Sequence, residues 1–136
     1  MAFMEWTDEC SVGVRQFDDD HRAIVQIADE LQKAINVGID KSQLILIIDR
    51  VDALATQHFA HEEVAFDKSG YPNAATHKGQ HSVARAMRDN FRDEVLRAGA
   101  SHHAMEVLLL LKGWFLLHVQ QEDKEFGTFL NSKDVR

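Results

Sequence analysis

Histidines and carboxylates are concentrated in the segment "HFAHEEVAFDKSGYPNAATHKGQH", which runs from His58 to His81 and holds four of the eight histidines. His58 and Glu62 are four residues apart, as are His77 and His81, so each pair shares one face of a helix. Imidazole and carboxylate groups are ligands for iron, zinc or copper, and a carboxylate also joins two metal ions. A single pair at this spacing is a weak indication of a metal site, whereas several such pairs together are a strong one.

Four helices are expected to carry these residues, because apolar side chains recur every three or four positions. One proline and seven glycines are few helix breakers, which suits long helices. No period-two alternation occurs, so no sheet is expected. The first expected helix begins at Asp18, Asp19 and Asp20 and ends at Gly38, and the second begins near Lys41 and ends before Gly70. The third begins after Asn73 and ends near Gly99, and the fourth runs from about Ser101 to about Leu130.

Four helices with short connections favour an all-α, up-down-up-down four-helix bundle. The residues up to about Phe17 have no helical stripe and are expected to form an irregular N-terminal lead-in. The length of 136 residues suits one domain, residues 1–136, and the hydrophobic content of 45% is enough to bury a core.

This topology brings histidines from all four helices to one level. His21 lies three residues before Ile24 on the first helix, and His118 lies four after Trp114 on the fourth. The start of the first helix, the end of the second, the start of the third and the end of the fourth meet at one end of the bundle. Burying histidines and carboxylates is costly unless each is satisfied, so the concentration predicts a metal centre. Three histidines are interpreted instead as residues that bind no metal. His61 is rotated away from the stripe of Glu62, and His102 and His103 are expected at a helix start in solvent.

The fourth helix offers two acids for this centre. Glu122 lies about 40° from His118 around a regular helix, whereas Asp123 lies about 140° away. Regular geometry therefore favours Glu122. Asp123 reaches the centre only if the helix widens into a π-type turn or if it approaches from the flank. The spacing alone leaves both acids open.

Five histidines with two carboxylates suit a pair of iron ions. Two six-coordinate ions that share both carboxylates and one oxo or hydroxo bridge keep a single position open, where dioxygen could bind. No glutamate is followed three residues later by histidine, which is the step found in carboxylate-rich di-iron bundles. Because a histidine-rich site is less able to stabilise high-valent iron, reversible binding is favoured over oxygen activation.

The motifs resemble those of the bacteriohemerythrins, the bacterial members of the hemerythrin family. "MEWTDECSVGVRQFDDDH" matches the tryptophan, glycine and aspartate that lead to the family's first histidine. "HFAHEE", "YPNAATHKGQH" and "WFLLHVQQED" match its three later signatures, so the resemblance covers almost the whole chain. It implies a hemerythrin-like domain over residues 1–136 that binds dioxygen reversibly, for carriage or storage, at a non-heme di-iron centre.

The resemblance also implies a role for each ligand. One iron would be held by three histidines and the other, with the open position, by two, while two carboxylates and an oxo or hydroxo group would bridge them. The first iron would be held by His77, His81 and His118, and the second by His21 and His58. The bridging carboxylates would be Glu62 and Asp123. The choice of Asp123 follows the family pattern and predicts either a π-type bulge between His118 and Asp123 or an approach of Asp123 from the flank.

Four side chains are expected by position to line the dioxygen pocket: Ile24, Phe59, Phe115 and Val119. Phe115 departs from the leucine expected three residues before the fourth-helix histidine. Asp18, three residues before His21, is a candidate hydrogen-bond partner for a ligand histidine. Asp20 stands where the family usually has glutamine and is given no functional role.

Composition disfavours several other classes of protein. The net charge of -7 argues against a nucleic-acid partner and against an anionic membrane surface. No apolar run approaches the roughly 20 residues of a membrane span, and the N-terminus lacks a signal-peptide pattern. The single cysteine, Cys10, excludes an intramolecular disulfide, and a cytoplasmic location is expected.

Two other functions stay open beside carriage or storage. Hemerythrin-like domains also occur as oxygen-sensing parts of chemotaxis and signalling proteins, in which case a signalling domain would be the partner; a carrier could instead supply an oxygen-consuming enzyme. The third function is a di-iron enzyme that scavenges peroxide or nitric oxide. No additional acid–base group is evident in the expected pocket, so no enzyme activity beyond a weak peroxidase type is expected.

Overall fold

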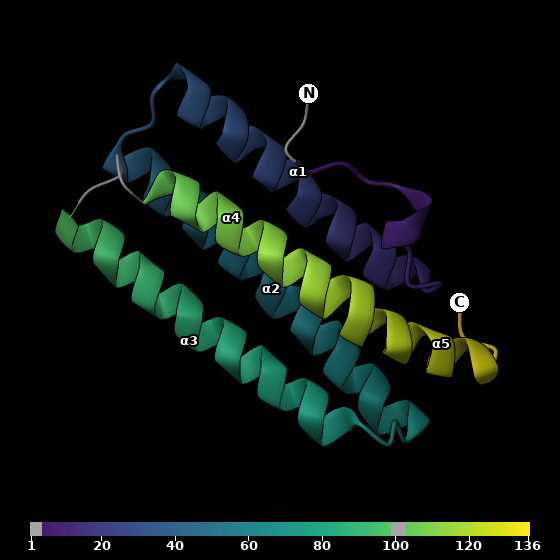
Figure 1. Cartoon of the computed structure of the whole chain (residues 1–136). Coiled ribbons are helices and arrows are strands. Elements are labelled where there is room, and N and C mark those ends of the chain that lie inside the picture. Colours follow the sequence, from purple (N-terminus) through teal and green to yellow (C-terminus); the bar gives the residue numbers. More distant parts are fainter. Residues whose placement is uncertain (1–3, 99–102) are drawn as a thin grey trace.

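The computed structural model describes residues 4–98 and 103–136, and the regular structure in these ranges is entirely helical. The elements are the 3-10 helix η1 (Asp8–Cys10), α1 (Arg15–Val37), α2 (Lys41–Ser69), α3 (Ala74–Ala98), α4 (Ala104–Trp114), the π-helical segment η2 (Phe115–Asp123) and α5 (Lys124–Ser132). The last three follow one another without a break and form the fourth rod of an up-down-up-down bundle (Figure 1). The predicted fold is therefore confirmed.

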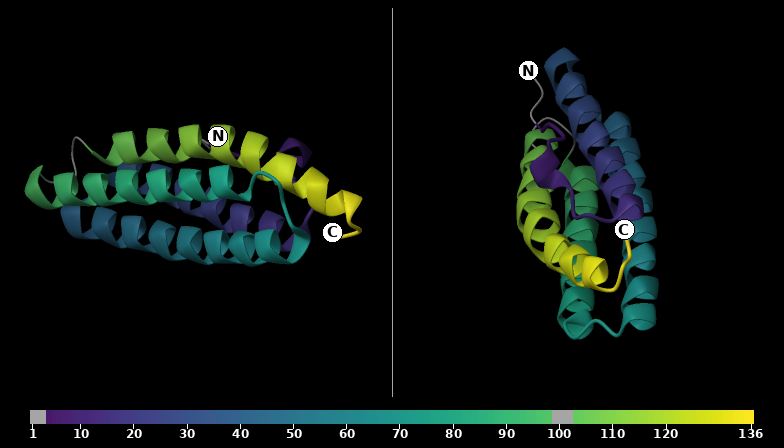
Figure 2. Two further views of the ribbon diagram at one scale, coloured as in Figure 1. Left: turned by 90° about the horizontal axis from the view of Figure 1, so that it is seen from below. Right: turned by 90° about the vertical axis from the view of Figure 1, so that its right-hand side faces the viewer.

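The ends of the helices are arranged as the topology predicts. The start of α1, the end of α2, the start of α3 and the whole of α5 lie at the same end of the bundle (Figure 1). Figure 2 shows the helices aligned along one long axis, with the connection between α2 and α3 near the C-terminus. Within the described ranges, no helix combines the length and apolar character that crossing a membrane requires.

Local signals in the sequence determine both ends of α2. The Asp40 carboxylate accepts a hydrogen bond from the Gln43 backbone N–H (2.8 Å), and the Gln43 side-chain oxygen accepts one from the Asp40 backbone N–H (3.0 Å). This capping box satisfies two donors that the first turn leaves unpaired. Gly70 ends the helix in the left-handed conformation (φ 66°), which glycine adopts without steric cost.

The predicted start of the first helix at residues 18–20 is wrong, because α1 begins three residues earlier, at Arg15. Asp18 is already helical and bonds back to the lead-in instead of capping the helix. Its carboxylate accepts hydrogen bonds from the Val12 backbone N–H (2.8 Å) and the Ser11 hydroxyl (2.6 Å). Asp18 thus ties the irregular lead-in to the first turn of α1.

The lead-in covers the fourth rod through close backbone contact. The Asn131 side-chain N–H donates to the Gly13 carbonyl oxygen (2.9 Å). Gly127 lies so close to Val12 that a Cβ atom there would overlap the Val12 carbonyl oxygen. Val12, like Phe126 beside this contact, is buried in the core. The missing side chain of Gly127 therefore allows the lead-in to seal this end of the bundle.

Candidate metal centre

All seven side chains predicted to hold metal ions come together inside the bundle. Each is almost completely buried, with no more than 6% of its surface exposed. They are contributed by α1 (His21), α2 (His58 and Glu62), α3 (His77 and His81) and η2 (His118 and Asp123). Seven buried polar side chains in one place need partners of opposite charge or hydrogen-bond partners, because burial without them is costly in free energy.

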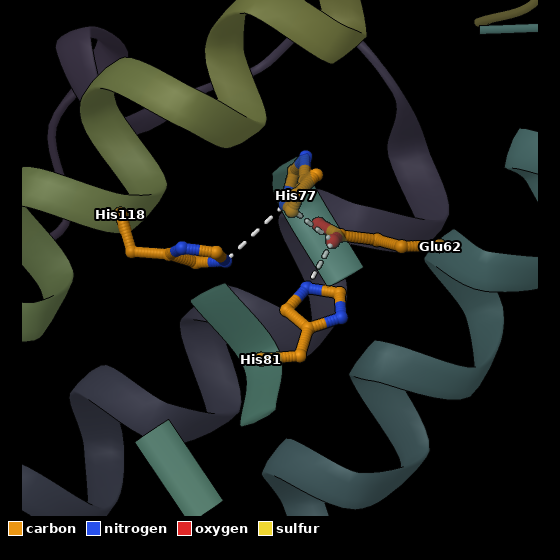
Figure 3. A group of neighbouring side chains, drawn as sticks. All are labelled: Glu62, His77, His81 and His118. Atoms are coloured by element: carbon orange, nitrogen blue, oxygen red, sulfur yellow. Dashed lines mark hydrogen bonds and ion pairs between the residues drawn. The ribbon is translucent and has the colours of Figure 1, made fainter. Parts of the chain in front are cut away.

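These side chains form two groups that could each hold a metal ion. Within each group the possible ligand atoms all lie within 4.8 Å of one another. The first group comprises Glu62, His77, His81 and His118, and the second comprises His21, His58, Glu62 and Asp123. Figure 3 shows the first group, with the Glu62 carboxylate directed at His77 and His81 and with His118 facing His77. Glu62 belongs to both groups, so the two sites are adjacent.

Asp123 divides its two oxygen atoms between the two sets of histidines. Oδ1 lies 2.7 Å from His77 Nε2 and 3.1 Å from His118 Nε2. Oδ2 lies 2.9 Å from His21 Nε2 and 3.0 Å from His58 Nε2. A carboxylate placed in this way can bridge two metal ions, with one oxygen on each.

Glu62 makes a second bridge of the same kind. Its Oε1 lies 2.8 Å from His58 Nε2, whereas its Oε2 lies 2.9 Å from both His77 Nε2 and His81 Nε2. The two carboxylates thus separate the histidines into a set of three and a set of two. This division matches the one that the sequence resemblance implies.

The spacing of these atoms fits metal ions better than hydrogen bonds alone. The Nε2 atoms of His21 and His58 are 3.0 Å apart, and those of His77 and His118 are 3.3 Å apart. Neighbouring ligand atoms on one ion lie about 3 Å apart when the bonds to the metal are about 2.1 Å long. Glu62 Oε1 and Asp123 Oδ1 are buried and make no hydrogen bond of normal geometry, although histidine nitrogens are close. Both atoms are therefore oriented as ligands that still lack a partner.

The charges of the metal-free cluster are dominated by its two carboxylates. Burial opposes ionisation of Asp123, but hydrogen bonds from His118 and other histidines hold its pKa well below the usual range. Burial and the nearby Asp123 oppose ionisation of Glu62, yet His58 and His77 lower its pKa to about 2. Burial disfavours protonated His77, but Asp123 and Glu62 raise its pKa to about 9. Metal ions binding here would displace protons from histidine.

The predicted π-type bulge is present and distinguishes the two acids of the fourth rod. The π-helical segment η2 begins at Phe115 and ends at Asp123, so it contains the whole interval from His118 to Asp123. A π turn has about 4.4 residues, which brings the fifth residue to within about 50° of the first. Asp123 accordingly lies inside the cluster and is fully buried, whereas Glu122 is half-buried.

Two aspartates on α1 have roles different from those predicted. Asp18 was expected to bond a ligand histidine, but its hydrogen bonds go to the lead-in. Asp20 was given no role, yet its Oδ2 lies 2.9 Å from His58 Nδ1 and 2.9 Å from His61 Nδ1. The two histidines lower the pKa of Asp20 against the opposing effect of burial. Since His58 and His61 are three residues apart on α2, their shared face was the available signal.

The three histidines predicted to lie outside the centre have different outcomes. His61 contributes no ligand atom to either group and is partly buried, with its Nδ1 2.9 Å from Asp20 Oδ2. His103 precedes α4 with its Nδ1 3.3 Å from a Glu106 carboxylate oxygen, away from the seven-residue cluster. His102 lies outside the described residues.

The four predicted pocket residues are all buried, at different places around the cluster: Ile24, Phe59, Phe115 and Val119. The Phe115 ring meets His21 edge-on at 6.1 Å between centroids, on the side with two histidines. Phe59 instead stacks on His81 at 3.9 Å, on the side with three. Phe59 and Ile24 also line a largely apolar cavity of about 710 Å³ between α2, α3 and α4, which reaches His118.

Comparisons with known proteins agree with this arrangement. The family model described as the hemerythrin HHE cation binding domain matches residues 12–130. The chain is 28% identical over 128 residues to a bacteriohemerythrin of Stenotrophomonas maltophilia, covering 93% of this chain and 81% of that one. It is 26% identical over 133 residues to a bacteriohemerythrin of Methylococcus capsulatus, covering 97% and 100%.

Solved structures support the same comparison. A crystal structure of wild-type hemerythrin superimposes with a TM-score of 0.80 at 25% identity, covering 95% of this chain and 98% of that one. A hemerythrin variant with a leucine replaced by tyrosine gives a TM-score of 0.81 at 25% identity, with 96% and 98% coverage. The fold and the order of its helices are thus shared over nearly the full length.

Proposed function

Since the chain belongs to the hemerythrin family, we propose that it binds dioxygen reversibly, for carriage or storage, at two iron ions held by five histidines and two bridging carboxylates. The observation that carries this proposal is the unequal division of the histidines by Glu62 and Asp123. Three histidines contact one side of these carboxylates and two contact the other. When bound, the iron pair supplies the electrons and the open coordination position that dioxygen requires.

The protein's own residues position the ions and keep water away. His77, His81 and His118 would hold one ion, and His21 and His58 the other. Phe115 is buried beside His21 on the two-histidine side, and Val119 is buried next to His118 in the sequence. Neither side chain carries a group that could donate or accept a proton. An apolar surrounding of this kind favours binding of a small neutral molecule over chemistry that needs an acid or a base.

The central test is a spectrum of the iron-loaded protein. We expect two iron ions per chain by metal analysis and a reduced form without visible colour. Exposure to air should produce a visible charge-transfer absorption that is at least partly lost when oxygen is removed. One zinc per chain without iron, after growth with ample iron, would contradict the metal assignment. Irreversible oxidation without an oxygenated form would contradict reversible binding and leave the fold unaffected.

A separate assay distinguishes binding from catalysis. We infer that the chain is not an enzyme, because the predicted pocket residues bring no acid–base group beside the ligands themselves. Sustained turnover of hydrogen peroxide or nitric oxide by the iron-loaded protein would instead support the scavenging function. A cytoplasmic location and an oxygen-sensing role are both predictions that rest on the sequence alone.

Phe115 gives a prediction about access to the two-histidine side. Phe115→Ala removes the ring that meets His21 edge-on and opens space beside this histidine. Azide binding and autoxidation should each become about tenfold faster, which corresponds to about 1.4 kcal/mol in the barrier. Phe115→Leu should have a smaller effect in the same direction. The exposed neighbour provides the control, and Leu116→Ala should leave both rates unchanged. Equal rates in all variants would mean that Phe115 serves only the core.

A further inference from the structure

Three side chains form a hydrogen-bonded series that leads from the protein surface to the metal centre. Asp20 Oδ2 lies 2.9 Å from His61 Nδ1 and 2.9 Å from His58 Nδ1. The exposed fraction of the side chain falls along this series, from 27% for His61 through 15% for Asp20 to 0% for His58. Asp20 therefore connects a partly exposed histidine to a fully buried one.

His58 differs in this respect from the other histidines of the centre. Within residues 4–98 and 103–136, Asp20 is the only carboxylate in hydrogen-bond distance of an Nδ1 atom of these five histidines. His21 Nδ1 and His81 Nδ1 are buried without a hydrogen-bond partner. The nearest acid to His81 Nδ1 is Glu63, at 4.0 Å. The contact to Asp20 thus singles out one histidine of the two-histidine set.

The contact to Asp20 favours the form of His58 that can bind a metal ion through Nε2. An Nδ1–H that donates to Asp20 leaves the lone pair on Nε2, the atom that lies near Glu62 and Asp123. A carboxylate bonded in this way also fixes the orientation of the ring and increases its strength as a ligand. His61 donates to the same oxygen of Asp20, so it restrains the carboxylate from the outer side.

We propose that Asp20 and His61 act as a positioning pair that holds His58 in the tautomer and orientation needed to bind its metal ion. Asp20 is on α1 and His61 is on α2, so the pair also joins the two helices that supply the two-histidine side. This inference rests on the proposed metal centre. It concerns the retention of metal and does not depend on dioxygen.

The test measures the release of cobalt(II), loaded as the only metal, into excess chelator. The wild-type chain should bind two ions. Asp20→Ala should release one of them about 10–100-fold faster, the range expected when an outer partner of a metal-binding histidine is lost. Asp19→Ala is the matched control, because it removes an exposed carboxylate one residue away that pairs with Arg22 and, among the described residues, with no histidine. Release from this control should match that from the wild type.

Substitutions of His61 and a second readout separate positioning from general stability. His61→Ala should speed the same release phase, whereas His61→Asn keeps an N–H donor for Asp20 and should restore slow release. Proton NMR of the cobalt-loaded chain should find a His58 Nδ1–H that exchanges slowly with solvent in the wild type and in Asp19→Ala, and one that exchanges faster in Asp20→Ala. A merely structural role for Asp20 would leave this exchange rate unchanged.

The outcomes distinguish this inference from the proposed function. Folded Asp20→Ala that keeps the wild-type exchange rate of the His58 Nδ1–H and releases both ions at the wild-type rate would overturn the positioning role alone. A wild-type chain that binds no pair of metal ions would overturn the proposed metal centre, and with it the basis of the inference. Should Asp20→Ala fail to fold, Asp20→Asn gives the comparison, because its amide oxygen still accepts from His58. Cobalt release at the wild-type rate from Asp20→Asn, together with fast release from His61→Ala, would then support the inference. Release at the wild-type rate from both variants would overturn it.

Discussion

Asp123→Ala is expected to lose most of the bound iron, together with the visible spectrum of the iron pair. Asp123 contacts four histidines, two through each oxygen, so its removal affects both sides of the centre. Loss of an outer partner of a ligand typically weakens metal binding by about 10–100-fold. Loss of a bridging ligand should exceed about 100-fold for the pair of ions, measured as iron retained after dialysis against a chelator.

The neighbouring acid provides a strict control for this experiment. Glu122→Ala removes a carboxylate one residue away that is half-buried and belongs to neither group of the seven-residue cluster. It should keep both iron ions and the spectrum. If Glu122→Ala lost the iron while Asp123→Ala kept it, the fourth rod would be regular in solution and the assignment of the bridge would be wrong.

Gly127→Ala should strongly destabilise the fold without touching any ligand. The new Cβ atom would overlap the carbonyl oxygen of Val12 and lie 2.9 Å from its carbonyl carbon. Both atoms belong to the backbone, so no change of side-chain rotamer relieves the overlap, and the lead-in must move away from α5. We expect a loss of about 3 kcal/mol in the free energy of unfolding, at the upper end of the usual range for overpacking. Urea denaturation of the metal-free protein measures this loss directly.

A second helical glycine tests whether the effect comes from the contact with Val12. A Cβ atom at Gly113 would meet nothing within 4 Å. Gly113→Ala should therefore be neutral or stabilising by up to about 1 kcal/mol, because alanine is the better helix former. Equal destabilisation by the two substitutions would show that the close approach of the lead-in to α5 does not matter for stability.

The sequence predicts the helices and the ligand set well because both depend on local spacing. The pairs at His58 and Glu62 and at His77 and His81 need only helical periodicity to face inward, and the up-down topology then aligns them. The start of α1 was missed because Asp18 finds its partners in the lead-in, which has no periodic pattern.

Contacts between helices were the hardest feature to predict. The bond from Asp20 to His61 joins α1 to α2, and neither residue is unusual within its own helix. The π-helical segment was predicted only because Asp123 had to reach the centre. Spacing alone favoured Glu122, since a regular α-helix is the default geometry. The sequence therefore predicted which residues of each helix face the centre, but not the contact between Asp20 and His61 across two helices.

The π-helical segment η2 also bears on how this fourth rod could change length during evolution. Leu111 and Leu130 would point about 100° apart on an uninterrupted α-helix, yet both are buried in the core. This difference of about 100° equals the rotation of one residue in an α-helix. Because the wider turn of η2 removes that rotation, Leu111 and Leu130 face the same side. The segment η2 thus accommodates the equivalent of a one-residue insertion without turning α5 away from the core. Deletion of one residue between His118 and Asp123 would restore a regular helix with the acid at the fourth position. Related chains can therefore differ by one residue inside this helix while keeping the same core.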